Sequence, residues 1–186
     1  MTERIIISGF GWQGIMFLGK LIAWAAMREN KFVTFLPAYG AEVRGGTSHC
    51  AIVISDEEIA SPCVDTIDTL IAMNSPSLEK FIPQAKKGAD VFVNSSMVSD
   101  FKKINGIHWH NVPFTDIALK LGNVKSANSV ALGVYLAKKK ILSPGNIITM
   151  LPEAFKNNQK LVDLNEKAIK EGLKYSGFHD SEVATC

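Results

Sequence analysis

Cysteine is scarce in this sequence. Only three of the 186 residues are cysteines, Cys50, Cys63 and Cys186. The odd count, the wide spacing and the lack of a CxxC pair argue against a disulfide framework and against a zinc site, and they fit a reducing cytoplasm. The sequence also has no iron–sulfur run of cysteines, so we expect any such cluster to belong to another chain.

Excess charge and long apolar runs are missing as well. The formal net charge is only +2, and no basic cluster alternates with aromatic residues, which disfavours nucleic-acid binding. The run Lys138–Lys140 is typical of a helix C-terminus that faces water. The most apolar stretch, Ile15–Met27, contains Lys20 and is too short to span a bilayer, and the charged start MTERIII is unlike a secretory signal. We therefore expect no membrane association.

The length predicts one domain, residues 1–186, and the periodicity predicts an α/β fold. It is Rossmann-like, with a mainly parallel sheet flanked by helices and an α-helical C-terminal third. Ser75 and Ser143 are the expected N-caps of two helices. The expected strands are Arg4–Ser8, Phe32–Leu36, Thr47–Ser55, Asp68–Met73, Asp90–Asn94 and Gly106–Val112. The expected helices are Gln13–Glu29, Pro76–Phe81, Thr115–Leu121, Ala127–Lys140, Pro144–Phe155 and Gln159–Tyr175.

The strongest motif is the glycine turn IIISGFGWQG, in which Gly9, Gly11 and Gly14 join the first strand to the first helix. Such a turn lets backbone N–H groups approach a phosphate at a helix N-terminus. An ordinary dinucleotide site needs an acidic residue at the end of the second strand. That strand ends Leu36-Pro37-Ala38, and Glu42 lies well past it. Trp12 also places a bulky indole in the turn. A purely structural tight turn remains the alternative.

A second motif is the glycine-rich segment PAYGAEVRGGTSHC, which contains Tyr39, Glu42 and Arg44. An arginine can bind a phosphate or a carboxylate through two hydrogen bonds, and paired glycines allow close backbone approach to a ligand or another chain. The alternative is a surface ion pair between Glu42 and Arg44. We favour a binding site because long loops with such specific chemistry usually carry function.

Small polar residues follow two further strands. If the strands are parallel, Asn74 and Ser75, and then Asn94, Ser95 and Ser96, reach the sheet edge that carries the glycine turn. Ligands of open α/β sheets bind at that edge, so the sequence predicts one shared crevice. Helix capping by these residues is the alternative, and both roles are compatible.

Other candidate residues favour structural roles. His108 and His110 share one strand face, but no third ligand is evident, which disfavours a metal site. Cys50 directly follows His49, and a nucleophilic Cys–His pair is one interpretation. Adjacent strand residues point to opposite faces, however, so we expect Cys50 to be buried and inert. The sequence also lacks a nucleophile elbow, a Walker loop and a carboxylate dyad. These residues alone favour a binding subunit over a complete enzyme.

The combination of GFGWQG, PAYGAEVRGGTSHC, VISDEEIASP, DTLIAMNSPSLEKF and ANSVALGVYLAKKKILSP resembles the gamma subunit of 2-oxoacid:ferredoxin oxidoreductases, with the 2-oxoglutarate branch most similar. The resemblance covers most of the chain. It implies oxidative decarboxylation of a 2-oxoacid to an acyl-coenzyme A, with electrons passed to ferredoxin. The residues that match the family motifs are Gly9, Gly11, Gln13, Gly14, Tyr39, Gly40, Glu42, Arg44, Gly45, Gly46 and Thr47.

The same resemblance implies the cofactors and partners. Thiamine diphosphate, magnesium and iron–sulfur clusters belong to partner subunits, and this chain lies on the coenzyme A side of the active site. The expected partners are alpha and beta subunits, a ferredoxin-like delta subunit and, indirectly, ferredoxin. Independently of the resemblance, the nearly continuous apolarity of the predicted helix Gln13–Glu29 favours a covered surface, for which a homodimer is one explanation. Trp12 departs from the family turn, which usually reads GFGGQG. It either crowds a phosphate or offers a stacking face to an adenine or a partner chain.

Two functions therefore stand at this point. The first is a gamma-type subunit that supports coenzyme A binding and assembly of an oxidoreductase complex. The second is a free-standing Rossmann-type nucleotide-binding protein, acting as a small oxidoreductase or a ligand sensor. The glycine turn is common to both, and the loop around Arg44 favours the first.

Overall fold

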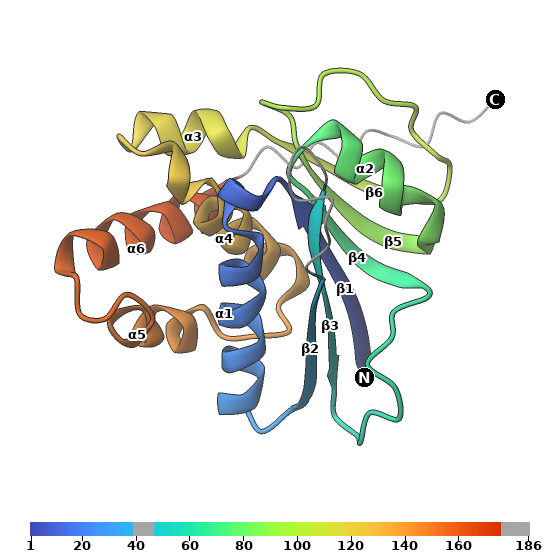
Figure 1. Cartoon of the computed structure of the whole chain (residues 1–186), viewed down its shortest axis with the longest axis horizontal. Helices are drawn as coiled ribbons and strands as arrows, with labels where there is room; N and C mark the ends of the chain where they lie inside the picture. The colour runs from blue at the N-terminus through green and yellow to red at the C-terminus, as the bar shows by residue number, and fades with distance from the viewer. Residues whose placement is uncertain (39–46, 176–186) are drawn as a thin grey trace.

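A six-stranded sheet with helices on both faces forms the centre of the protein (Figure 1). Its computed structural model describes residues 1–38 and 47–175. The strand order is β2-β3-β1-β4-β5-β6. The strands are β1 (Thr2–Gly9), β2 (Phe32–Ala38), β3 (Ser48–Ser55), β4 (Ile67–Ala72), β5 (Ala85–Asn94) and β6 (His108–Val112).

The helices are distributed unequally between the two faces. In Figure 1, α1 and α3 to α6 lie on the left of the sheet and α2 lies on the right. The helices are α1 (Ile15–Arg28), α2 (Ser75–Phe81), α3 (Phe114–Lys120), α4 (Ala127–Lys139), α5 (Pro144–Ala154) and α6 (Gln159–Lys174). The expected α/β fold, with its helical C-terminal third, is confirmed.

Strand β3 is the exception to the parallel arrangement. It pairs antiparallel with both β1 and β2, whereas β4 pairs parallel with β1, β5 with β4 and β6 with β5. Residues 39–47 link β2 to β3, and so short a link allows a hairpin, whereas a parallel neighbour needs a crossover of about a dozen residues or more. As a result, the end of β2 and the start of β3 lie at the same sheet edge as Gly9, which is opposite Ser48.

Each face of the sheet has its own hydrophobic core. On the side of α1 and α4, Ile5, Ile7 and Phe92 pack with the helices. On the side of α2, Ile6 and Val91 pack with Leu78 and Phe81, among others. The alternation of Ile5, Ile6 and Ile7 between the two cores follows from the period of two in a strand, and it explains why the sequence of β1 is continuously apolar.

Three local expectations were wrong. Asn74, not Ser75, caps α2, because its side-chain Oδ1 accepts the N–H of Ser77 at 3.0 Å. The first long helix begins at Ile15, since Gly11–Gln13 forms a short 3-10 turn before it. Lys139 does not face water: its side chain is 16% exposed and forms ion pairs within the fold. Ser143 does precede α5 as expected, although its side chain makes no capping hydrogen bond.

Candidate functional site

The glycine turn has the predicted strand–turn–helix geometry. Strand β1 ends at Gly9, and Gly14 adopts a left-handed conformation with φ of 70° immediately before α1. A Cβ on Gly9 would lie 2.7 Å from Gln13 Oε1 and 2.9 Å from Met73 Cβ, whereas one on Gly14 would collide with the Asn128 side chain. These two glycines are therefore required by close packing and backbone conformation, whatever else the turn binds.

Gln13 holds this turn against the residues that directly follow β4. Its Oε1 accepts the N–H of Phe10 at 2.7 Å and the Nδ2 of Asn74 at 3.1 Å, while its Nε2 donates to the Met73 carbonyl at 3.2 Å. Asn94 donates to the same carbonyl at 3.2 Å. The three amide side chains are buried. The structure thus brings Gln13, Asn74 and Asn94 together, as predicted, but their polar groups bond to one another and to the backbone.

Asn94 extends this polar cluster toward α3. Its Nδ2 donates to the Thr115 Oγ1 at 2.9 Å, and its Oδ1 accepts the N–H of Thr115 at 3.3 Å. The neighbouring Ser95 is exposed, and its N–H donates to the Val112 carbonyl at 3.0 Å. Asn94 therefore fixes the relative positions of β4, β5 and α3 at this edge, while Ser95 remains accessible.

The second predicted motif falls mostly outside the described residues. This applies to Tyr39, Gly40, Glu42, Arg44, Gly45 and Gly46, whereas Thr47 is described and directly precedes β3. The two ends that flank this segment are well placed: Ala38 pairs with His49, and Ser48 pairs with Gly9. The described residues that flank the segment therefore lie beside the glycine turn, as the expected shared edge requires.

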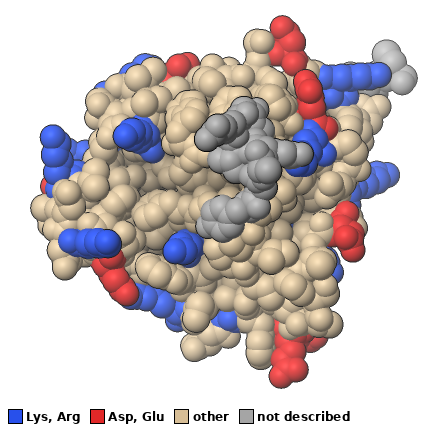
Figure 2. All heavy atoms as spheres, in the orientation of Figure 1, with Lys and Arg blue, Asp and Glu red and all other residues tan. Residues whose placement is uncertain are grey.

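A groove borders the turn on the side of the helices. Its volume is about 380 Å³, and it lies among the glycine turn and the starts of α1, α4 and α6. Phe17 and Phe155, whose ring centroids are 4.8 Å apart, line it together with Trp12 and Lys125. The indole of Trp12 is 59% exposed and stacks on Phe10. In Figure 2, charged side chains gather mainly around the rim of the face that α1 crosses. Sequence reasoning missed this groove, because its walls come from distant segments.

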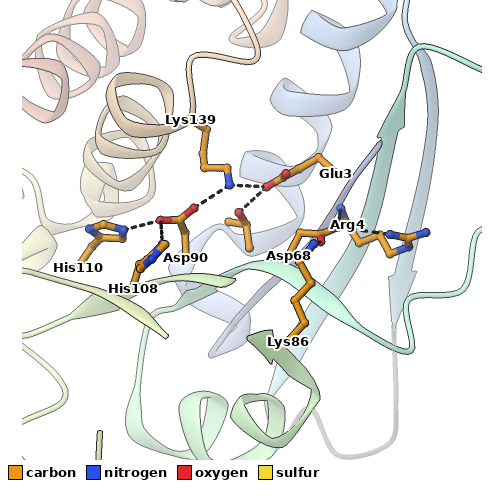
Figure 3. Close-up of polar contacts among 9 residues, drawn as sticks. Glu3, Arg4, Asp68, Lys86, Asp90, His108, His110 and Lys139 are labelled. Carbon is orange, nitrogen blue, oxygen red and sulfur yellow. Dashed lines mark hydrogen bonds and ion pairs between the residues drawn. The ribbon is translucent and has the colours of Figure 1, made fainter. Parts of the chain in front are cut away.

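A buried polar network lies toward the other end of the strands, away from the glycine turn (Figure 3). Lys139 donates to Asp90 Oδ2 at 2.7 Å and pairs with Glu3 Oε1 at 3.1 Å, and His110 Nε2 lies 2.8 Å from Asp90 Oδ1. Burial alone raises the pKa of Asp90, but the hydrogen bonds with His110 and Lys139 outweigh it and lower that pKa to about 2. His108 shares this strand face, as expected, at 3.7 Å from Asp90. The network ties the end of α4 to three strands.

Cys50 is buried against α1, where its Sγ lies 3.8 Å from the Ile15 carbonyl. Burial raises the pKa of the thiol to about 12, so very little thiolate is present at neutral pH. We expect a variant that retains only Cys50 (Cys63→Ser, Cys186→Ser) to resist a thiol reagent such as DTNB at pH 8 until it is unfolded in urea. The matched variant that retains only the exposed Cys63 should react at once. Rapid native labelling of Cys50 would contradict the inert role.

Neither a membrane helix nor a metal cluster is found in the part of the chain that the structure describes. Of the helices there, none is long and apolar enough to cross a membrane. Within the same residues, no group of three or more His, Cys, Asp or Glu side chains is placed to hold a metal ion.

Comparison with known proteins decides the family. The family described as pyruvate ferredoxin/flavodoxin oxidoreductase matches residues 4–175, which include the glycine turn and helices α1 to α6. The chain belongs to this family. This chain is 36% identical to the ketoisovalerate oxidoreductase subunit VorA of Methanothermobacter marburgensis, over 93% of this chain and 36% of VorA. The chain thus spans about a third of the length of that relative.

Two further relatives match this chain over most of their own length. The 2-oxoglutarate synthase subunit KorC of Methanothermobacter marburgensis is 33% identical over 85% of this chain and 87% of KorC. The gamma subunit of a keto/oxoacid ferredoxin oxidoreductase from Geobacter sulfurreducens PCA has a TM-score of 0.79 at 27% identity, covering 91% of this chain and 95% of that chain. The expected resemblance to gamma subunits of 2-oxoacid:ferredoxin oxidoreductases is confirmed.

Proposed function

We propose that this family member is the gamma-type subunit of a multisubunit 2-oxoacid:ferredoxin oxidoreductase, in which it supports coenzyme A binding and subunit assembly. The observation that carries the proposal is the near full-length match to KorC, which is named as a subunit of a 2-oxoglutarate synthase. The family match over residues 4–175 supports the same assignment.

The geometry of one sheet edge supports a binding role. The glycine turn meets Ala38 and Ser48 there, which flank segment 39–47, and loops at this edge bind ligands in open α/β sheets. Arg44 lies within that segment, and a guanidinium is suited to the phosphates of coenzyme A. We therefore assign Gly11, Trp12 and Gly14 of the turn, together with the predicted residues of the segment, to a surface that faces coenzyme A or a partner chain.

The rest of the reaction is assigned to partner chains in this proposal. Thiamine diphosphate, magnesium and an iron–sulfur cluster would be held by alpha, beta and ferredoxin-like delta subunits, and ferredoxin would receive the electrons. The isolated chain would then have no activity of its own. The scarcity of cysteine supports a cytoplasmic location for such a complex.

Two 2-oxoacids are candidate substrates of the proposed complex. The loop sequence favours 2-oxoglutarate, as KorC does through its name. A branched-chain 2-oxoacid is the second candidate, because VorA, named for ketoisovalerate, is 36% identical over 93% of this chain. Measuring kcat/KM of the complex for 2-oxoglutarate and 2-oxoisovalerate with coenzyme A and a viologen acceptor separates the two.

Replacing Arg44 with alanine tests the role of this chain in the complex. If the guanidinium binds coenzyme A phosphate, we expect the KM for coenzyme A to rise about tenfold or more with little change in kcat, since a charge-assisted hydrogen bond contributes roughly 1.5–3 kcal/mol. If the residue contacts a partner chain, gel filtration will show weaker assembly.

Arg28→Ala is the matched control for this experiment. Arg28 is exposed at the end of α1 and pairs only with the exposed Glu153, at 3.3 Å, among the described residues. Its removal should leave the KM and the assembly unchanged. An Arg44→Ala complex with wild-type kinetics and assembly would overturn the role of Arg44, and failure to assemble with any thiamine-dependent partner would overturn the function itself.

A further inference from the structure

Trp12 is an exposed aromatic side chain at the mouth of a groove. The 3-10 turn Gly11–Gln13 carries it, and its indole ring stacks on Phe10 with the ring planes 23° apart. Hydrogen bonds from Gln13 hold this turn in place, so the indole is presented by a fixed backbone. An exposed indole on a rigid support offers a flat surface on which another ring can stack.

The charge of the groove indicates which group a ligand would carry in addition to a ring that stacks on Trp12. Its described lining residues include one cation, Lys125, and no carboxylate. Lys125 is exposed in the short 3-10 turn Val124–Ser126 that precedes α4, and among the described residues its ammonium group forms no ion pair. A site with an ammonium group and without a carboxylate favours an anion.

One side of the groove is apolar, whereas Asn123, Ser126, Asn128 and Asn165 line the rest of it. Phe17 and Phe155 contact each other within the groove, and Leu161 and Leu164 of α6 complete that side. A volume of about 380 Å³ falls within the range of roughly 300–1,000 Å³ that is usual for small-molecule sites. An aromatic ring that carries phosphate groups satisfies both the apolar side and the single cation.

We propose that this groove binds a purine nucleotide moiety, with the base stacked on Trp12 and a phosphate at Lys125. The inference rests on the proposed function, since the adenosine end of coenzyme A is one source of this chemistry and a free adenine nucleotide is the other.

Equilibrium binding to the assembled complex tests the site, with adenosine 3′,5′-bisphosphate, ADP and 4′-phosphopantetheine as probes. Trp12→Gly should weaken binding of the two adenine nucleotides about tenfold or more, as expected for loss of one base–aromatic stack. It should leave binding of 4′-phosphopantetheine, which lacks the base, unchanged. Trp12→Phe should restore most of the nucleotide affinity.

Lys125→Gln tests the phosphate contact. Nucleotide affinity should fall and lose much of its dependence on salt, while Lys140→Gln, an exposed lysine at the far end of α4, should leave both unchanged. Preference for the bisphosphate over ADP identifies coenzyme A as the source, and the reverse identifies a free nucleotide. Either supports the site.

Two results would overturn the inference. One is the absence of measurable nucleotide binding, and the other is equal nucleotide affinity in the wild type and Trp12→Gly. The proposed function has a separate readout, because coenzyme A-dependent turnover and subunit assembly are measured on the same complexes. A Trp12→Gly complex with normal turnover and normal nucleotide affinity would reject the groove while retaining the gamma-type function.

Discussion

Replacing Lys139 with methionine should destabilise the protein by about 3 kcal/mol at neutral pH, measured by urea unfolding. Removal of one partner from a buried ion-paired network costs roughly 3–5 kcal/mol, because the remaining charges lose their compensation. Here Glu3 and Asp90 would remain on the sheet without the cation that each now contacts (Figure 3). Methionine keeps an unbranched apolar stem and is only one heavy atom shorter, so the loss is chiefly that of the charge.

The acid dependence of this effect gives a second readout. Because its folded-state pKa is lowered to about 2, ionised Asp90 contributes stability above its unfolded pKa of about 4, and that contribution is lost as the pH falls toward 2. The difference between wild type and Lys139→Met should therefore shrink between pH 5 and pH 2. Lys140→Met, one residue along and exposed, is the control and should change stability by less than about 0.5 kcal/mol. Equal effects of the two substitutions would exclude a specific role for the network.

Replacing Gly133 with alanine should destabilise the protein by about 2 kcal/mol or more. Gly133 of α4 faces Gly172 of α6 where the two helices cross, and a Cβ on Gly133 would lie 2.9 Å from both the Gly172 Cα and the Leu173 N and would collide with the Ile169 carbonyl. Those atoms are backbone and cannot move aside as a flexible side chain would. Overpacking of a close contact typically costs 1–3 kcal/mol, and here it must separate two helices.

Gly145→Ala is the matched control for this substitution. Gly145 lies in the first turn of α5, and the nearest atom to a Cβ there is the Ser143 Oγ at 3.5 Å, an ordinary contact. Alanine should therefore be neutral or slightly stabilising, as its higher helix propensity predicts. If thermal melts place Gly133→Ala and Gly145→Ala together near the wild type, the two helices do not pack as closely as described.

The sequence predicted the elements well because their signals are local. The buried run Ile5–Ile7, the glycines that follow it and the long apolar helix after them all express the period of a single element. One of the errors was local in kind as well. Asn74 and Ser75 are both good capping residues, and only the φ and ψ angles of the folded chain decide which of them is the cap.

The candidate site was predicted in part. Residues at strand ends could be assigned to one edge because parallel strands share their carboxyl ends. The hydrogen bonds among this cluster could not be predicted. Gln13 bonds to Asn74, about 60 residues away in the chain, and both Gln13 and Asn94 donate to the Met73 carbonyl. Lys139 shows the same limit: its charge pattern indicated a solvent-facing helix end, but the sheet places two carboxylates beneath it.

The sequence by itself determined the α/β fold class, the glycine turn and the family of this protein, because each depends on residues that are close together in the chain. Only the tertiary structure decided the antiparallel place of β3, the buried network around Lys139 and the groove beside Trp12. Each of these depends on contacts between distant segments, and periodicity along the chain carries no information about which segments meet.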